Sequence, residues 1–224
     1  MFYKPVIKTS FKIFKWYTLK RIMKLDQQTI DFYNLKSSEY SSWSFKHNKD
    51  DLLSKFLDKI KERSNILDLG CGAGHDSYFF ASRGFSVTAL DASKNLLSEV
   101  PFHSNIEIVN SDFISFKTNH KFNGIWSSFS LQHIPKKYFQ NTLKLLLQSL
   151  NKGGVFYIGI HEGNKEVRDS LGRFYSFYRE KEILDILKIV GLQVFDLIKD
   201  KSESYDGEEI KIMHIFLKNS ILSN

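Results

Sequence analysis

The chain has 224 residues, of which 42% are hydrophobic, and this is enough for one domain with a complete hydrophobic core. Its single cysteine excludes an intrachain disulfide, and no stretch reaches the ~18 consecutive apolar residues of a membrane span. The formal net charge of +7 comes from residues 1–24, because the remaining 25 basic and 25 acidic residues balance. A neutral body disfavours a nucleic-acid substrate, which needs a basic face.

Residues 1–24 form a basic N-terminal extension that precedes a domain over residues 25–224. Four lysines of the extension recur three or four residues apart, which predicts an amphipathic helix with a basic face. Such a helix can touch an anionic membrane surface or direct a protein to an organelle. The alternative is an extension upstream of a second start at Met23 that packs loosely. We otherwise expect a cytoplasmic protein, because one cysteine fits a reducing compartment.

Strands and helices alternate along the domain. Apolar residues at helical spacing predict a helix over 50–61, and the apolar run 65–69 predicts a buried strand. Three glycines follow, and then a helix that ends at Gly84. Because the alternation continues, we predict an α/β fold with a mainly parallel sheet covered by helices on both faces. The further strands are expected at 86–91, 105–110, 122–129, 155–160, 194–198 and 210–217, the further helices at 92–99, 136–150 and 180–190, and a turn at 151–154.

The three glycines at the end of the first strand form the most informative motif. Glycine lets the backbone turn tightly and lets a ligand approach the main chain closely. A dinucleotide fingerprint, G-x-G-x-x-G, would need a glycine where the chain has His75, so the spacing disfavours a Rossmann oxidoreductase. The pattern here is D-x-G-x-G-x-G, beginning at Asp68.

The run NILDLGCGAGHDS at residues 65–77 resembles motif I of the class I S-adenosylmethionine-dependent methyltransferases. Matches to further family motifs follow in the right order, and the resemblance covers residues 26–218. It implies a doubly wound, seven-stranded, mostly parallel sheet with an antiparallel last strand. It also implies S-adenosylmethionine as the cofactor and S-adenosylhomocysteine as the product.

Ligands of an open α/β sheet bind beyond the carboxyl ends of its strands, and the predicted cofactor contacts fall there. Asp68 faces the methionine amine or orders the glycine turn. Asp91 can accept hydrogen bonds from the ribose hydroxyls, or it can cap the next helix, although Ser93 can do that equally well. By resemblance, Asp112 accepts a hydrogen bond from the adenine amino group, and Phe113 packs on the ring or supplies a backbone N–H. The alternative for Asp112 is a surface turn.

Two further regions contribute predicted cofactor contacts. By resemblance, Tyr33 and Tyr40 lie on helices that cover the methionine end, where aromatic faces favour a sulfonium cation. The alternative is that both rings simply pack on the core. The run SSFSLQHIP, which begins at Ser127, matches a later family motif that lines the same end. The complete predicted set is Asp68, Gly70, Cys71, Gly72, Gly74, Asp91, Ala92, Asp112, Phe113, Ser127, Ser128, Tyr33 and Tyr40.

The acceptor side is predicted to follow the fourth and fifth strands. His133 is the candidate general base, because imidazole titrates near neutrality. The alternative is a histidine that caps the next helix or donates to a carbonyl. The histidines are scattered and the cysteine lies in the glycine turn, so we expect no metal site. The predicted acceptor contacts are Gln132, His161, Glu162, Arg168, Arg173 and Tyr175.

The sequence therefore predicts a methyltransferase that transfers a methyl group by in-line displacement to a small-molecule acceptor. One alternative is a tRNA-modifying enzyme of the wobble-uridine type, suggested by the run F-Y-x-x-Y-R-E at 174–180 and disfavoured by the neutral body. Another is a methyltransferase-like scaffold without activity, against which the intact glycine motif argues. Contact of residues 1–24 with a membrane surface remains a further expectation.

Overall fold

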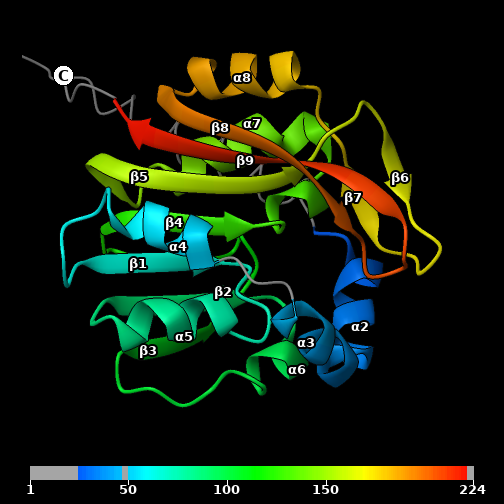
Figure 1. Cartoon of the computed structure of the whole chain (residues 1–224), viewed down its shortest axis with the longest axis horizontal. Coiled ribbons are helices and arrows are strands. Elements are labelled where there is room, and N and C mark those ends of the chain that lie inside the picture. Colours follow the sequence, from blue (N-terminus) through cyan, green and yellow to red (C-terminus); the bar gives the residue numbers. More distant parts are fainter. Residues whose placement is uncertain (1–24, 47–49, 221–224) are drawn as a thin grey trace, which may run out of the picture.

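The computed structural model describes residues 25–46 and 50–220, and it shows one sheet with helices on both faces (Figure 1). The predicted basic extension at residues 1–24 lies outside the described residues. None of the described helices is long and apolar enough to cross a membrane. The helices are α2 (Gln27–Leu35), α3 (Ser37–Phe45), α4 (Asp50–Leu57), α5 (His75–Ser82), α6 (Lys94–Leu97), the 3₁₀ helix η1 (Leu131–His133), α7 (Lys136–Leu146) and α8 (Glu180–Ile189).

Seven strands form the main sheet in the order β3-β2-β1-β4-β5-β9-β8. All neighbours from β3 to β5 are parallel, whereas β9 runs antiparallel to both β5 and β8. The predicted doubly wound, seven-stranded sheet with an antiparallel last strand is thereby confirmed. The strands are β1 (Asn65–Leu69), β2 (Ser86–Asp91), β3 (Ile106–Asn110), β4 (Phe122–Ser128), β5 (Leu150–His161), β8 (Leu192–Glu203) and β9 (Glu209–Asn219), and β6 (Glu166–Arg168) pairs with β7 (Phe174–Ser176) in a separate hairpin.

Alternation along the central strands divides the core into two layers. Ile125 of β4 pairs with Phe156 of β5, and the next residues, Trp126 and Tyr157, also pair. Because successive side chains of a strand point to opposite faces, these two pairs enter different hydrophobic clusters. All four residues are fully buried, as expected for parallel strands covered on both sides.

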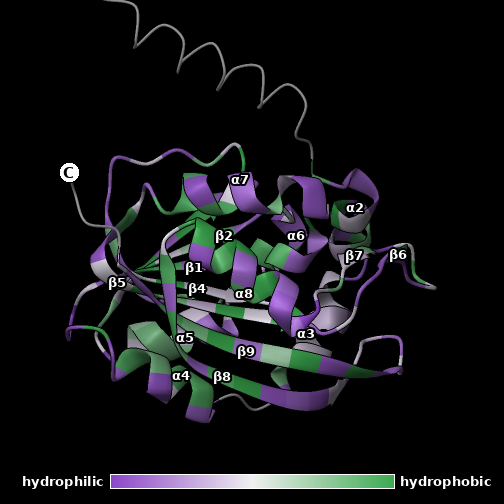
Figure 2. Ribbon diagram, turned by 90° about the horizontal axis from the view of Figure 1, so that it is seen from above, coloured by the Kyte–Doolittle hydropathy of each residue, from purple (hydrophilic) through white to green (hydrophobic). Residues whose placement is uncertain are grey.

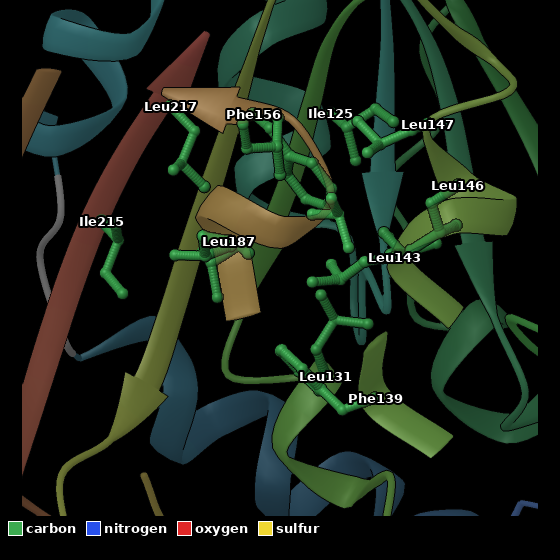
Figure 3. Packing of buried hydrophobic residues seen from close by; sticks show 14 of the residues in the cluster. Ile125, Leu131, Phe139, Leu143, Leu146, Leu147, Phe156, Leu187, Ile215 and Leu217 are labelled. Atoms are coloured by element: carbon green, nitrogen blue, oxygen red, sulfur yellow. The ribbon is translucent and has the colours of Figure 1, made fainter. Parts of the chain in front are cut away.

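Amphipathic helices cover each layer. Leu143 of α7 and Leu187 of α8 pack with Ile125 and Phe156 on one face of the sheet (Figure 3). Phe56 of α4 and Phe80 of α5 pack on the opposite face. Figure 2 shows hydrophobic and hydrophilic residues alternating along α7 and α8, so each helix keeps a polar side toward solvent. The helices therefore hold the sheet rigidly, and the strand ends remain available for a site.

Several predicted boundaries were wrong: the helix predicted over 50–61 ends at Leu57, and the strand predicted over 194–198 extends from Leu192 to Glu203. Around β5 the reason is that long-range pairing overrides the local pattern. The helix predicted over 136–150 ends at Leu146, since Leu150 already pairs with Phe122 as the start of β5. The turn predicted at 151–154 lies inside β5, where the register shift between Phe122 and Gly124 absorbs the extra residues as a bulge. The hairpin of β6 and β7 was not predicted at all, because its strands have only three residues each.

The carboxyl ends of β1, β2 and β4 lie beneath a cap formed by α2 and α3 (Figure 1). Strand order reverses between β1 and β4, and this is the point where open α/β sheets bind ligands. The cap contributes little to the core, because Thr29 is the only buried residue of α2 and α3 has none. It therefore closes the strand ends through polar and aromatic contacts.

Candidate functional site

The glycine turn folds over the end of β2. The backbone N–H groups of Gly70 and Cys71 both donate to the carbonyl of Leu90, at 2.7 and 2.9 Å. Gly70 has φ +77°, and a Cβ there would lie 2.3 Å from the Cβ of Ser130. Gly72 also has a positive φ, but a Cβ there would meet no atom within 4 Å. Gly70 is therefore required by packing, whereas Gly72 leaves its backbone open to a cavity.

Asp91, at the end of β2, is oriented by two backbone N–H groups. Its Oδ2 accepts from Gly72 at 2.9 Å, and its Oδ1 accepts from Ser93 at 2.8 Å. Burial raises the pKa of this carboxyl, while the backbone N–H groups act in the opposite direction. Ser93 caps α6 by accepting from the N–H of Leu96. Asp91 is therefore not the helix cap, and its remaining lone pairs can accept hydrogen bonds from a ligand.

A cavity of about 90 Å³, here called the glycine-turn cavity, opens at this point. Asp91 and Gly72 form one side, and the side chains of Leu96 and Phe113 lie on its apolar wall. Such a combination fits a nucleoside, with a carboxylate for the sugar and apolar side chains for the base. The predicted cofactor contacts that line it are Gly70, Gly72, Asp91, Ala92, Phe113, Ser128, Tyr33 and Tyr40.

Asp68 and Cys71 line a neighbouring cavity of about 590 Å³. Asp68 is buried, and its Oδ2 accepts a hydrogen bond from Ser77 Oγ at 2.6 Å, so it ties the strand end to α5. Burial raises the pKa of the Cys71 thiol well above its usual value, which keeps the thiol neutral. This cavity shares Gly70, Gly72, Tyr40 and Ser128 with the glycine-turn cavity. The methionine contact predicted for Asp68 stays a prediction.

Three of the predicted cofactor contacts line neither the glycine-turn cavity nor its neighbour. Asp112 Oδ1 accepts from the N–H groups of Ile114 and Ser115, both at 2.7 Å, so it orders the turn after β3. Ser127 is buried and shares a hydrogen bond with Ser130. Gly74, with φ +76°, begins α5 and packs close to Val100. The ligand contacts predicted for these three residues stay predictions.

His133 has both ring nitrogens engaged. Nδ1 lies 2.6 Å from the carbonyl oxygen of Phe174, which only accepts, so Nδ1 carries the hydrogen. Nε2 then accepts from the hydroxyl of Tyr33 at 3.1 Å. Burial lowers the pKa of His133 to about 4, so the imidazole is neutral near pH 7. The lone pair on Nε2 of His133 therefore already accepts the hydrogen bond from Tyr33.

A third cavity, of about 410 Å³ and here called the aromatic cavity, lies beside the glycine-turn cavity. Its rings come from distant parts of the chain: Trp43 from α3, Phe129 after β4, Tyr175 from β7 and Tyr205 from the turn between β8 and β9. Arg173, which precedes β7, also lines it and is almost fully buried. Of the predicted acceptor contacts, those that line this cavity are Gln132, His161, Arg173 and Tyr175.

The other two predicted acceptor contacts line a different cavity of about 460 Å³, which shares His161 and Tyr175 with the aromatic cavity. Glu162 forms an ion pair with Lys199, with 2.7 Å between Oε1 and Nζ. Arg168 bridges to Asp26 at the start of α2, with Nη1 2.9 Å from Oδ1. Arg168 therefore connects β6 to the cap. An acceptor contact by either residue stays a prediction.

Four residues line both the glycine-turn and the aromatic cavities: Tyr33, Tyr40, Ser128 and Phe129. Phe129 adopts φ +57°, which is rare for a bulky residue and marks a backbone held under strain by its surroundings. Tyr33 and Tyr40 pack edge to face, with ring centroids 4.9 Å apart. A group that passes from one cavity to the other has to cross this boundary.

Sequence reasoning missed Trp43, Phe129, Tyr205 and His214 as walls of the aromatic cavity. No local motif distinguishes these aromatic residues from those of an ordinary core. The positive φ of Phe129, for example, depends on its N–H donating to the carbonyl of Gly159 in the neighbouring strand. Among the described residues, no group of three or more potential metal ligands is present.

Several contacts tie the cap to the body. Asn34 of α2 accepts hydrogen bonds from Ser93 Oγ and from the N–H of Asn95. Tyr33 and His133 share a hydrogen bond, and Asp26 and Arg168 form an ion pair. Thr29 Oγ1 accepts from the N–H of Phe174, and the Ser41 carbonyl lies 3.3 Å from His75 Nε2. The Arg168 guanidinium lowers the pKa of Asp26 to about 2. These ties place the cap residues over both cavities.

Comparisons with known proteins agree with this geometry. A family model described as a methyltransferase domain matches residues 41–197. An uncharacterized protein of Methanocaldococcus jannaschii is 27% identical in an alignment of 161 positions that covers 63% of this chain and 43% of that protein. The chain spans less than two thirds of the length of the curated relatives it matches.

Solved structures share the fold at low sequence identity. One is the Burkholderia thailandensis 1,6-didemethyltoxoflavin-N1-methyltransferase with bound 1,6-didemethyltoxoflavin and S-adenosylhomocysteine, at a TM-score of 0.70 and 15% identity over 87% of this chain and 88% of that chain. Another is the N-methyltransferase NodS of Bradyrhizobium japonicum in complex with S-adenosylhomocysteine, at a TM-score of 0.61 and 18% identity over 80% and 92%.

Proposed function

The chain belongs to the S-adenosylmethionine-dependent methyltransferases of class I, and we propose that it methylates a small molecule held in the aromatic cavity. The observation that carries this proposal is the shared boundary of the two cavities. The glycine-turn cavity offers a carboxylate and an apolar wall for the nucleoside of the cofactor, and the aromatic cavity is large enough for an acceptor. The methyl group would cross between them.

In this proposal Asp91 accepts hydrogen bonds from the ribose hydroxyls, and Phe113 packs against the adenine ring. The backbone at Gly72 allows the cofactor to approach closely. Tyr33 and Tyr40 present aromatic faces toward the sulfonium end, where they favour a cation. Asp68, which lines the adjoining cavity, is the proposed contact of the methionine amine. S-adenosylmethionine, when bound, supplies a methyl group already activated by its positive sulfur.

The chain's own residues act mainly by positioning. The two tyrosines and Phe129 hold the acceptor in line with the methyl group, and such alignment can remove ~7–11 kcal/mol from the barrier. With the cofactor bound, the acceptor's lone pair would form the new bond to the methyl carbon while sulfur would keep the electron pair of the broken carbon–sulfur bond. In the structure Tyr33 donates to Nε2 of His133, so His133 could take a proton from the acceptor only by way of Tyr33 or after Tyr33 moves. In this proposal the acceptor reacts through an existing lone pair, and any proton that it loses goes to solvent.

The structure lends no specific support to a tRNA substrate. The run at 174–180 that suggested one contains Tyr175 and Tyr178, which are both buried, so it offers no exposed platform for RNA. The neutral charge of residues 25–224 also disfavours a polyanion. The solved relative from Burkholderia thailandensis holds a small heterocyclic molecule. We therefore keep the small-molecule acceptor as the proposal.

The domain itself is proposed to span residues 25–224, with residues 1–24 as a separate extension. We also keep the cytoplasm as the proposed compartment, because a chain with a single cysteine fits a reducing environment. Removal of residues 1–24 is expected to leave the affinity for S-adenosylhomocysteine unchanged. A large loss of affinity in a folded truncated protein would show instead that the extension belongs to the site.

Calorimetric titration of the purified chain with S-adenosylmethionine and S-adenosylhomocysteine tests the proposal. Micromolar dissociation constants for both are expected, which correspond to about −8 kcal/mol. If a folded sample binds neither, the enzymatic proposal fails and the scaffold alternative takes its place.

A further inference from the structure

Two buried nitrogen atoms in the walls of the aromatic cavity have no hydrogen-bond partner among the described residues. Among the described residues, neither His161 Nδ1 nor Arg173 Nη2 has a hydrogen-bond partner, although both atoms are buried. His161 is 6% exposed and Arg173 is 2% exposed, and both line the aromatic cavity. A buried polar group without a partner costs free energy, so such atoms mark places where a ligand can supply the missing partner.

The contacts of Gln132 decide which nitrogen of His161 carries the hydrogen. The Oε1 atom of Gln132 accepts from the backbone N–H of His161 at 3.1 Å, which fixes the orientation of the amide. Its Nε2 then lies 3.4 Å from His161 Nε2. Because an amide nitrogen only donates, His161 Nε2 must accept. Burial lowers the pKa of His161 to about 3, so the ring is neutral and its one hydrogen lies on Nδ1.

Arg173 offers a donor whose charge is already balanced. Its Nε lies 2.6 Å from Oδ2 of Asp169, and its Nη2 lies 3.6 Å from Oδ1 of Asp206. These two carboxylates compensate the guanidinium, so a further anion would gain little. The ring of Tyr175 stacks on His161 at 5.2 Å with an interplanar angle of 11°, and the guanidinium carbon lies 5.3 Å from the same ring. Tyr175 thus holds both donor side chains.

Three further rings of the aromatic cavity favour a flat ligand, and its remaining lining includes Asp200, Lys201 and Glu203. Tyr40 and Trp43 pack with ring centroids 5.5 Å apart, and Tyr205 packs against both. Aromatic walls bury a planar ring system well and add stacking contacts. The cavity volume of about 410 Å³ is in the range of small-molecule sites.

Building on the proposed function, we propose that the methyl acceptor is an uncharged, planar aromatic or heteroaromatic molecule whose carbonyl oxygen or ring nitrogen accepts hydrogen bonds from His161 Nδ1 and Arg173 Nη2. A cationic acceptor would not satisfy the two N–H groups, because a protonated nitrogen donates hydrogen bonds and cannot accept them. An anionic acceptor would add a third negative group beside Asp169 and Asp206. A neutral ring with a hydrogen-bond acceptor satisfies both buried N–H groups without either conflict.

The test uses the full chain saturated with S-adenosylhomocysteine and three two-ring probes of similar shape. These are isoquinolone, which has a neutral carbonyl, 1-naphthoate, which is an anion, and 1-naphthylmethylamine, which is a cation. In calorimetric titrations isoquinolone is expected to bind at least about tenfold more tightly than the other two, the effect of one or two satisfied hydrogen bonds.

Variants then test whether the preference for isoquinolone comes from the N–H group of His161. His161→Phe keeps an aromatic ring against Tyr175 but removes the N–H, and it is expected to weaken isoquinolone binding about tenfold with S-adenosylhomocysteine affinity unchanged. Tyr178→Phe is the matched control. It also removes a buried polar atom without a hydrogen-bond partner among the described residues, but Tyr178 does not line the aromatic cavity. This control is expected to bind isoquinolone as the unaltered chain does.

The outcomes separate the two proposals. Normal S-adenosylhomocysteine binding without a preference for isoquinolone, or without binding of any probe, overturns the inference and leaves the methyltransferase proposal standing. An unchanged isoquinolone affinity in a folded His161→Phe variant overturns it as well. If the unaltered chain does not bind S-adenosylhomocysteine, the proposed function fails and the inference falls with it. The probe comparison in the unaltered chain decides the question even if His161→Phe does not fold.

Discussion

Asp91 is the residue on which nucleoside binding is expected to depend most. Both of its oxygens are held in place by backbone N–H groups, so no reorganisation is needed when ribose hydroxyls arrive. Asp91→Ala is therefore expected to weaken S-adenosylmethionine binding at least about tenfold, since hydrogen bonds to a carboxylate are worth about 1.5–3 kcal/mol each. Calorimetry measures the affinity, and thermal unfolding checks that the variant folds.

Asp112→Ala is the matched variant, because Asp112 also follows a strand and also accepts two backbone N–H groups. It does not line the glycine-turn cavity. A smaller loss of affinity than for Asp91→Ala would fit that position, whereas an equal loss would support the predicted adenine contact. Unchanged affinity in Asp91→Ala would exclude the ribose assignment.

The two neutral histidines give the stability of the chain a defined pH dependence. Burial lowers the pKa of His133 to about 4 and that of His161 to about 3, whereas an unfolded histidine titrates near pH 6.5. Below pH 6.5 the unfolded chain therefore binds more protons than the folded chain. Stability from these groups is complete above pH 6.5 and is lost as the pH falls toward 4.

Urea unfolding between pH 7 and pH 5 is expected to show this loss as a slope of about 1 kcal/mol per pH unit for each imidazole near pH 5.5. Replacing His133 by Gln removes one titrating group and should flatten the slope by about half. A slope that is the same in both proteins would mean that His133 is not held neutral in the folded chain.

At the scale of the element, the turn between β1 and α5 combines a strained backbone with an open cavity. Gly72 at this turn and Gly84 after α5 both have positive φ, and a Cβ at either would meet no atom within 4 Å. Of these two glycines, Gly72 lines the glycine-turn cavity and Gly84 does not. Gly72→Ala and Gly84→Ala are therefore expected to destabilise the fold alike, by about 1–2 kcal/mol.

The effects of Gly72→Ala and Gly84→Ala on ligand binding should differ. Gly72→Ala is expected to lower the affinity for S-adenosylhomocysteine at least about tenfold, because the added methyl group occupies space that the ligand needs. Gly84→Ala should leave that affinity intact. Equal affinities of the two variants, measured by calorimetry, would show that the backbone at Gly72 does not face the ligand.

The glycine turn, Asp91 and the sheet could be predicted from the sequence because their signals are local. Each strand is a short apolar run, and Asp91 follows its strand directly in the chain. The aromatic cavity could not be predicted in the same way. Trp43, Phe129 and Tyr205 come from three separate segments, and only the finished topology brings them together. The ends of α7 and β5 were misplaced for a related reason, since pairing of Leu150 with Phe122 depends on residues far apart in sequence.

At the scale of the whole molecule, the cap of α2 and α3 is the part with the least core of its own. It is held by Asn34, by Tyr33 and by the Asp26–Arg168 ion pair. Elements with few buried residues open with low free energy, and a ligand beneath them raises that energy. Amide hydrogen exchange in residues 27–45 is therefore expected to slow on addition of S-adenosylhomocysteine by a larger factor than exchange in β1 and β4.

Arg168→Ala provides a matched comparison for the cap. An exposed ion pair contributes only about 0–1 kcal/mol to stability, so the melting temperature should hardly change. Dissociation of S-adenosylhomocysteine should nevertheless become faster, because one of the contacts that hold the cap over the cavity is lost. Exchange in the cap that does not respond to the ligand would contradict a closing role for α2 and α3.

The position of β9 has a consequence for how the chain is made. β9 is the last strand in sequence, yet it lies between β5 and β8. During translation the strands that carry the glycine turn and Asp91 emerge early, whereas one edge of β5 stays unpaired until residues 209–219 have left the ribosome. That edge is apolar on both faces, and such edges readily pair with other chains. The nascent protein thus contains the glycine turn and Asp91 before β9 can pair with β5, and the unpaired edge of β5 is open to other chains in between.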